Sequence, residues 1–249
     1  KFDFIFENID TTKEKDYLPV FITESISDLY YRRKPKAEKE YIKASRVSGV
    51  SNQSVAQFTG DMYQQVNLYE NFVSIFGKNF ISPVANQGLL SYRYYLMDST
   101  FIDNNWCYEI QFVPRRKREM TLEGTMWIND TTYAIKKIEG KISPDANINF
   151  VKSLEFKQLY TKVNNEAWML KDDDLFIDFV IADQQMGFYG QKHASYKNII
   201  VNQVREDAFY EGLERITLLD SADNRSESYW DVHRHDSLTD NQKGIYQMI

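Results

Sequence analysis

The chain has 249 residues, of which 43% are hydrophobic and 15% aromatic, and its formal net charge is −6. This length and apolar content allow one large domain or two small ones with a substantial core. The few glycines and prolines (10 and 5) argue against a disordered or low-complexity chain. The acidic balance disfavours nonspecific nucleic-acid binding, so we expect no nucleic-acid partner.

A hairpin is predicted near the start of the chain, after a short apolar-rich element over residues 1–9. An extended segment begins near Tyr17, because Pro19 keeps the residue before it out of the helical region, and the segment runs to about Tyr31. A basic turn follows at residues 32–36, and the chain returns over residues 38–47. We expect two antiparallel strands with a charged tip.

The apolar residues then change to a spacing of three or four, which is typical of one face of an α-helix. This stripe predicts one long helix over about residues 52–76, with a capping serine or asparagine at its start and Gly77 at its end. We expect the helix to lie on a sheet. The positions of the stripe are Val55, Phe58, Met62, Val66, Tyr69, Val73 and Phe76.

Antiparallel strands make up most of the rest. Residues 92–101 and 106–112 predict two strands, and a second basic turn follows at residues 115–118. A meander of four long strands occupies residues 120–182, because apolar and polar residues alternate there with period two between short polar turns. One further strand is predicted over residues 188–201.

Together these elements predict an α+β fold, in which a curved antiparallel sheet of roughly eight to ten strands forms a half-barrel on one long helix. We expect a single domain over residues 1–205. Residues 206–249 are interpreted as a linker or tail, in which a capping box at Ser237 starts a C-terminal helix that the sequence cuts short. The chain would then be a piece of a longer protein.

The sequence lacks the common motifs of a reaction centre, including GxSxG, Walker A, HExxH and CxxC. We therefore expect a noncatalytic domain without cofactors. His233 and His235 would place two imidazoles near Asp231 and Asp236, but no further ligand cluster accompanies them, so no metal site is predicted. Cys107 lies on a predicted strand without basic neighbours, which indicates a structural thiol.

The acidic residues suggest two further candidate sites, a calcium site and a catalytic pair of carboxylates. Asp172, Asp173 and Asp174 offer oxygen ligands for calcium, but the run lies in or beside a strand and lacks the form of a calcium loop. A pair of carboxylates acting as a glycoside hydrolase is the least favoured function, and it stays open because the separation of carboxylates in space is not visible in sequence.

The two basic turns are candidate sites for an anionic surface. Charged hairpin tips are most often simply solvated. The functional alternative is that both turns point together at lipid phosphates or lipopolysaccharide. Their cations are Arg32, Arg33, Lys34 and Lys36 in the first turn, and Arg115, Arg116, Lys117 and Arg118 in the second.

Several long runs resemble a Bacteroidetes outer-membrane protein family of unknown function, DUF5686. They include YLPVFITESISDLYY (residues 17–31), GDMYQQVNLYENFVSIFGKNFISPVA (60–85) and MWINDTTYAIKKIEGKISPDANINFV (126–151). The resemblance implies a carboxypeptidase-regulatory-like β-sandwich upstream and an outer-membrane β-barrel downstream. This chain would be the periplasmic domain between them, with both as partners.

The expected helix on a curved sheet also resembles the half-barrel of lipoprotein-carrier and sigma-regulator proteins, whose concave face holds acyl chains or peptide. That analogy implies a domain that binds a lipid, a lipoprotein or an extended peptide, although a fold does not fix a function. The alternative is a structural scaffold that docks to its own barrel without a small ligand. The candidate apolar residues, which would equally form an ordinary core, are Phe58, Met62, Met126, Ile128, Leu175, Ile177 and Phe179.

Overall fold

The computed structural model describes residues 21–49, 66–143, 145–146, 148, 151–181, 186–212 and 214–247. The chain divides into two compact units, of which one combines Lys1–Ala56 with Asn202–Ile249 and the other spans Gln57–Val201. This division differs from the expected domain over residues 1–205, because the first hairpin makes its contacts with the end of the chain.

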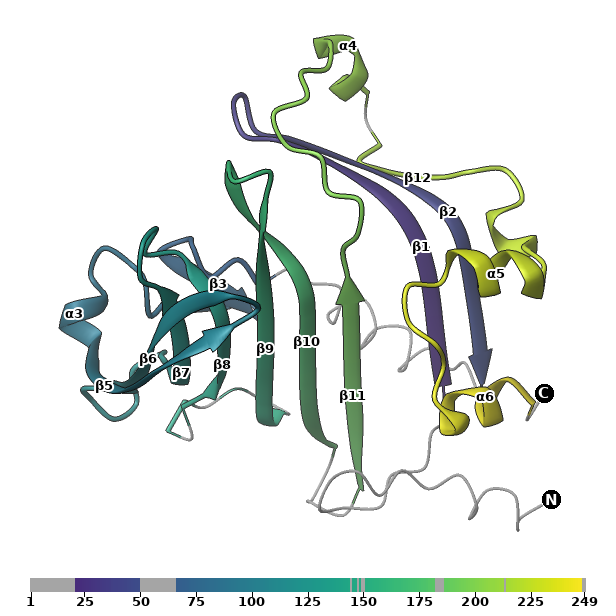
Figure 1. The fold of residues 1–249 in the computed structure, drawn as a ribbon. Helices are drawn as coiled ribbons and strands as arrows, with labels where there is room; N and C mark the ends of the chain where they lie inside the picture. Colours follow the sequence, from purple (N-terminus) through teal and green to yellow (C-terminus); the bar gives the residue numbers. More distant parts are fainter. Residues whose placement is uncertain are drawn as a thin grey trace. The chain divides into compact units, whose positions relative to one another are not determined.

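The larger unit is built on an open seven-stranded sheet with the order β11-β10-β9-β8-β7-β6-β5 (Figure 1). Each strand pairs antiparallel with its neighbour in sequence, which confirms the predicted meander. The strand predicted over residues 188–201 ends earlier than expected, at Ser195. The strands are β5 (Tyr92–Ile102), β6 (Asn105–Pro114), β7 (Leu122–Asn129), β8 (Ile135–Ile142), β9 (Val151–Val163), β10 (Ala167–Ile181) and β11 (Met186–Ser195).

One face of this sheet is covered by a small hairpin of β3 (Phe72–Ile75) and β4 (Lys78–Ile81). Val73, Ile75 and Phe80 of the hairpin are buried in one core cluster with apolar residues of the sheet. The hairpin is also bonded to the sheet, because the hydroxyl of Tyr92 donates to the carbonyl of Ile81 and accepts from the amide of Leu122 at 2.9 Å. The hairpin therefore seals part of the apolar face.

The prediction of one long helix over residues 52–76 is wrong for residues 66–76, the part that the structure describes. Residues 66–71 form coil and turns, and β3 follows. The apolar spacing of this stretch fits a helix, but β-branched Val73 and Ile75 alternate with exposed residues. Phe76 and Gly77 both have positive φ (47° and 69°), which makes the tight turn of a hairpin. Residues 52–65 of the predicted helix lie outside the described residues.

The smaller unit is a long ribbon of β1 (Phe21–Arg32) and β2 (Ala37–Gly49), which confirms the first predicted hairpin. β12 (Ile216–Leu218) pairs parallel with β2. The described part of the expected tail therefore belongs to a folded unit. Its remaining elements are α4 (Asp207–Tyr210), η1 (Ala222–Asn224), α5 (Glu227–His233) and α6 (Asp240–Gln247). Of the helices in the described ranges, none has the length and apolar character needed to cross a membrane.

Two glycines allow the backbones of β7 and β8 to lie unusually close together. Gly124 and Gly140 are direct cross-strand partners. A Cβ atom on Gly124 would lie 2.1 Å from the carbonyl oxygen of Glu139 and 2.6 Å from the Cα atom of Gly140, and neither backbone atom can move aside without disturbing the ladder. Glycine is required here because the two backbones approach so closely.

We predict that Gly124→Ala lowers the free energy of unfolding by about 3 kcal/mol, because the added methyl group forces β7 and β8 apart. Urea denaturation followed by circular dichroism measures this loss. Thr125→Ala, on the next residue, is the matched control and should change stability by less than about 0.5 kcal/mol. Equal stability of the Gly124 variant and the wild type would contradict the close approach.

Candidate functional site

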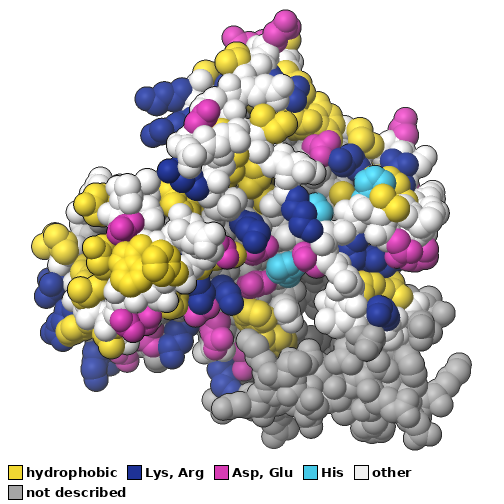
Figure 2. Space-filling model, in the orientation of Figure 1, with side chains coloured by type: hydrophobic (Ala, Val, Ile, Leu, Met, Phe, Trp, Pro, Cys, Tyr) yellow, Lys and Arg dark blue, Asp and Glu magenta, His cyan; other side chains and the backbone are white. Residues whose placement is uncertain are grey.

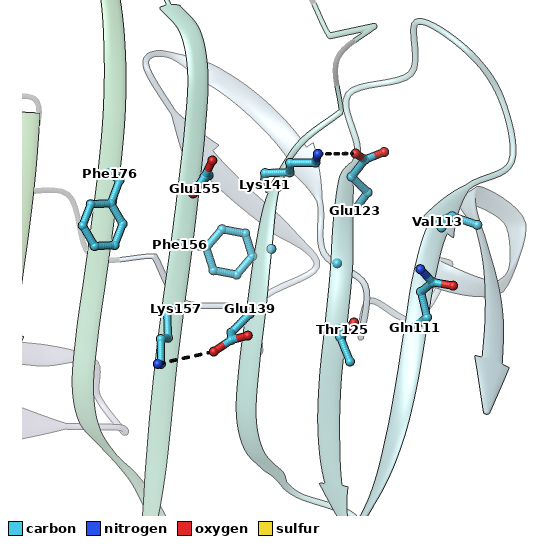
Figure 3. A pocket seen from close by; sticks show the side chains of 12 residues that line it. Gln111, Val113, Glu123, Thr125, Glu139, Lys141, Glu155, Phe156, Lys157 and Phe176 are labelled. Carbon is cyan, nitrogen blue, oxygen red and sulfur yellow. Dashed lines mark ion pairs between the residues drawn. The ribbon is translucent and has the colours of Figure 1, made fainter. Parts of the chain in front are cut away.

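A hollow of about 540 Å³ lies on the seven-stranded sheet, on the face opposite the core (Figure 3). Most side chains around it alternate along β7, β8 and β9 with the buried residues, so the same period that builds the core also builds the hollow. The core residue Phe156 also lines it, beside Gly140, which has no side chain. Its lining includes Gln111, Glu123, Glu139, Lys141, Lys157 and Phe176, together with the backbone of Gly124 and Gly140.

Two cross-strand ion pairs cross the hollow (Figure 3). Lys141 Nζ lies 3.3 Å from Glu123 Oε1, and Lys157 Nζ lies 3.4 Å from Glu139 Oε1. The strand register makes both contacts possible, because each lysine is the direct partner of its glutamate on the next strand. The hollow is therefore lined by charges of both signs in a regular pattern.

Glu139 is the electrostatic centre of this pattern. Its carboxylate also accepts from Lys137, whose Nζ lies 2.8 Å from Oε1. Burial alone would raise the pKa of Glu139, but the hydrogen bonds and charges of Lys137 and Lys157 outweigh it and hold the pKa below its ordinary value. Glu139 is thus a carboxylate at neutral pH and serves as a hydrogen-bond acceptor.

The smaller unit contains a second cluster of titratable groups, centred on Glu24 of β1. Arg46 Nε donates to Glu24 Oε2 at 2.8 Å, Arg234 Nε donates to Oε1 at 2.8 Å, and the Tyr246 hydroxyl donates to Oε2 at 2.5 Å. The side chains of Glu24 and both arginines are mostly buried. One carboxylate therefore connects β1, β2, the end of α5 and α6.

Aromatic rings complete the Glu24 cluster. The Arg46 guanidinium lies 3.8 Å from the ring centroid of Tyr246 and 4.9 Å from that of Trp230. Burial would raise the pKa of Glu24, but the bonds from Arg234, Tyr246 and Arg46 lower it. Every described partner is a group of this unit, so the cluster holds the unit together.

Residues 3–199 match the family described as "Family of unknown function (DUF5686)". The chain belongs to this family. Among solved structures, a putative outer membrane lipoprotein-sorting protein domain from Vibrio parahaemolyticus is similar at 8% identity with a TM-score of 0.28, covering 78% of this chain and 84% of that one. A similarity that low carries no argument about function. No curated protein matches the sequence.

In this DUF5686 chain, the candidate apolar residues do not form an open surface in the part that is described. Met126, Leu175, Ile177 and Phe179 are all buried in the core of the larger unit, and Ile128 packs at its edge. Phe58 and Met62 lie outside the described residues.

The predicted basic turns lie in different units. In the first, Arg32 pairs with Asp207 at 2.5 Å and lies over the ring of Tyr210. In the second, Arg115 donates to the carbonyls of Leu89 and Tyr92. Arg32 and Arg115 therefore have structural partners, and Arg33, Lys34, Lys36 and the four cations of the second turn are exposed.

The aspartate run does not gather into a metal site. Asp173 is 3% exposed and accepts from Gln158 and Lys192, whereas Asp174 contacts His193 at 2.6 Å. Alternation along β10 turns neighbouring carboxylates to opposite faces. Within the described ranges, no group of three or more His, Cys, Asp or Glu side chains could hold a metal ion.

The lining charges of the hollow were missed by the sequence analysis. Their signal was present as alternating acidic and basic residues at every second position, such as Glu139 and Lys141 in one strand and Glu155 and Lys157 in another. No local sequence pattern indicates the partners of Glu24, because Arg234 lies 210 residues further along the chain.

We predict that Glu24→Gln lowers the free energy of unfolding of the smaller unit by about 3 kcal/mol, because two mostly buried arginines lose their shared carboxylate. Limited proteolysis should then cut residues 206–247 sooner. Asp28→Asn in the same strand is the matched control, because the Asp28–Lys43 pair is half exposed and should contribute less than about 1 kcal/mol.

The same cluster predicts a pH dependence. Since the pKa of Glu24 is lowered on folding, its stabilisation is present above the ordinary value of about 4.5 and is lost as the pH falls through the lower folded-state value. Proteolysis of residues 206–247 should therefore accelerate below about pH 4.5 in the wild type. An equal acceleration in Glu24→Gln would contradict this assignment.

Proposed function

We propose that this DUF5686 chain is a noncatalytic domain that holds an extended polar segment, such as a peptide strand, in the hollow of its seven-stranded sheet. The observation that carries the proposal is the lining itself, in which Glu123, Glu139, Lys141 and Lys157 present charges of both signs across neighbouring strands. A peptide offers matching charges and backbone groups, whereas an acyl chain offers neither.

Burial supports a polar segment over a lipid. Met126, Leu175 and Ile177, which an acyl chain would need to contact, are at most 6% exposed and pack in the core. Transfer of a hydrocarbon chain onto the opposite face would bring it against lysine and glutamate side chains and strip water from them. The described surface therefore favours a hydrated, charged ligand.

Electrostatics supports a noncatalytic role. A glycoside hydrolase needs one carboxylic acid whose pKa is raised so that it can protonate the leaving group. The pKa of Glu139 is lowered instead, because Lys137 and Lys157 outweigh its burial. Its carboxylate is suited to accepting hydrogen bonds from a ligand and not to giving up a proton.

We place this domain on the periplasmic side of the outer membrane, between an upstream β-sandwich and the protein's own downstream barrel. The resemblance described in the sequence analysis implies this domain order for the family, and the match of residues 3–199 to the same family supports the proposal. The scaffold alternative, in which the domain docks to that barrel without a small ligand, is favoured by the fact that Lys141 and Lys157 already have partners within the sheet.

Selection of random dodecapeptides displayed on phage against the immobilised chain tests the proposal. Peptides that bind should lose about tenfold or more in affinity for a Glu139→Lys, Lys157→Glu double variant. This variant reverses the order of charges across the hollow and keeps the net charge. Fluorescence anisotropy of labelled peptides gives the affinities.

The matched control swaps the charges of a pair outside the hollow, Lys152 and Asp178, which lie 3.7 Å apart on β9 and β10. The Lys152→Asp, Asp178→Lys variant should bind the selected peptides as the wild type does. Equal losses in both variants, or the absence of any selectable peptide, would overturn the proposal and favour the scaffold.

A further inference from the structure

A basic and apolar knob projects from the larger unit where the short helix α3 (Gly88–Ser91) meets the turn of residues 115–118. We define the basic knob as Leu89, Leu90 and residues 115–118. Leu89 and Leu90 are 72% and 69% exposed, although both are large apolar side chains. Figure 2 shows hydrophobic side chains beside basic ones at the edge of the molecule where Figure 1 labels α3.

Backbone and side-chain bonds clamp the two parts of the basic knob together. The amide of Arg115 donates to the carbonyl of Ser91 at 2.8 Å, and its Nε donates to the carbonyls of Leu89 at 3.0 Å and Tyr92 at 2.7 Å. Ser91 Oγ also donates to Glu119 at 3.1 Å. The leucines and the cations are therefore held as one surface.

The basic knob carries a strong excess of positive charge. Four consecutive cations occupy residues 115–118, and all four are exposed. The neighbouring acid, Glu119, already accepts from Ser91 and lies 4.0 Å from Arg116. Lys117 and Arg118 have no ion-pair partner among the described residues. This surface needs an anionic partner that can also take up two leucines.

We propose that the basic knob docks on an anionic lipid surface, with Leu89 and Leu90 inserted among the headgroups and the cations of residues 115–118 against lipid phosphates. Apolar side chains that enter the interface beside lysine and arginine are the pattern of peripheral membrane binding. A stable protein interface uses roughly 20–30 residues on each side, far more than the six of the basic knob, so a lipid surface suits this small patch better than an acidic protein. The proposal is independent of the hollow and of its ligand.

Co-sedimentation of the chain with vesicles tests the proposal. The wild type should bind vesicles of phosphatidylcholine with one-third phosphatidylglycerol and should not bind phosphatidylcholine alone. Arg116→Gln, Lys117→Gln, Arg118→Gln should weaken binding about a hundredfold, at about fivefold for each cation. Arg115 stays unchanged because its guanidinium bonds to α3.

A second variant, Leu89→Ser, Leu90→Ser, separates lipid insertion from simple attraction of charge. It should weaken binding about tenfold or more without loss of thermal stability, since both side chains are exposed. The matched control, Arg33→Gln, Lys34→Gln, Lys36→Gln, removes three exposed cations from the first basic turn in the smaller unit and should bind as the wild type does.

Three results would overturn the proposal. The first is a wild type that does not bind the anionic vesicles. The second is an equal loss in the control and in the knob cation variant, which would indicate attraction by net charge. The third is unchanged binding of the leucine variant, which would indicate attraction by the cations alone without insertion of the leucines.

Discussion

The packing of the β3–β4 hairpin against one face of the seven-stranded sheet is the constraint on which the larger unit depends. A sheet of this size has two faces, and hydrophobic burial of one face is the main favourable term in its folding. Val73, Ile75 and Phe80 supply the cover. Where that face is covered, its apolar side chains are closed to a ligand, and the hollow lies on the other face, where Glu123, Glu139, Lys141 and Lys157 are among the lining residues.

The polar face depends on the same alternation. Residues that follow a core position by one place point outward, so the register that pairs Ile138 with Met126 also brings Lys141 opposite Glu123. The core and the hollow are therefore two consequences of one register, and a slip by one residue would destroy both. The smaller unit is organised differently, because one carboxylate, Glu24, connects its ribbon to the C-terminal helices.

Local patterns predicted the strands well, since alternation and polar turns such as Asn164-Asn165 act over a few residues. The helix over residues 66–76 failed because apolar residues at Val66, Tyr69, Val73 and Phe76 fit a helical period as well as a hairpin. The Phe76-Gly77 turn and the packing of β3 on the sheet favour the hairpin over the helix. A count of apolar periodicity includes neither of these effects. Contacts such as Glu24 with Arg234 depend on tertiary folding and were beyond prediction from local patterns.

An NMR titration of the isotope-labelled chain with palmitate and with a charged dodecapeptide selected for binding tests most directly whether the hollow, and not the apolar core, takes up a ligand. The peptide should shift the backbone amides of Glu123, Glu139 and Lys157, and palmitate should leave the methyl signals of Met126 and Ile177 unchanged. Shifts of those methyl signals by palmitate, with no response of the amides to the peptide, would contradict binding in the hollow.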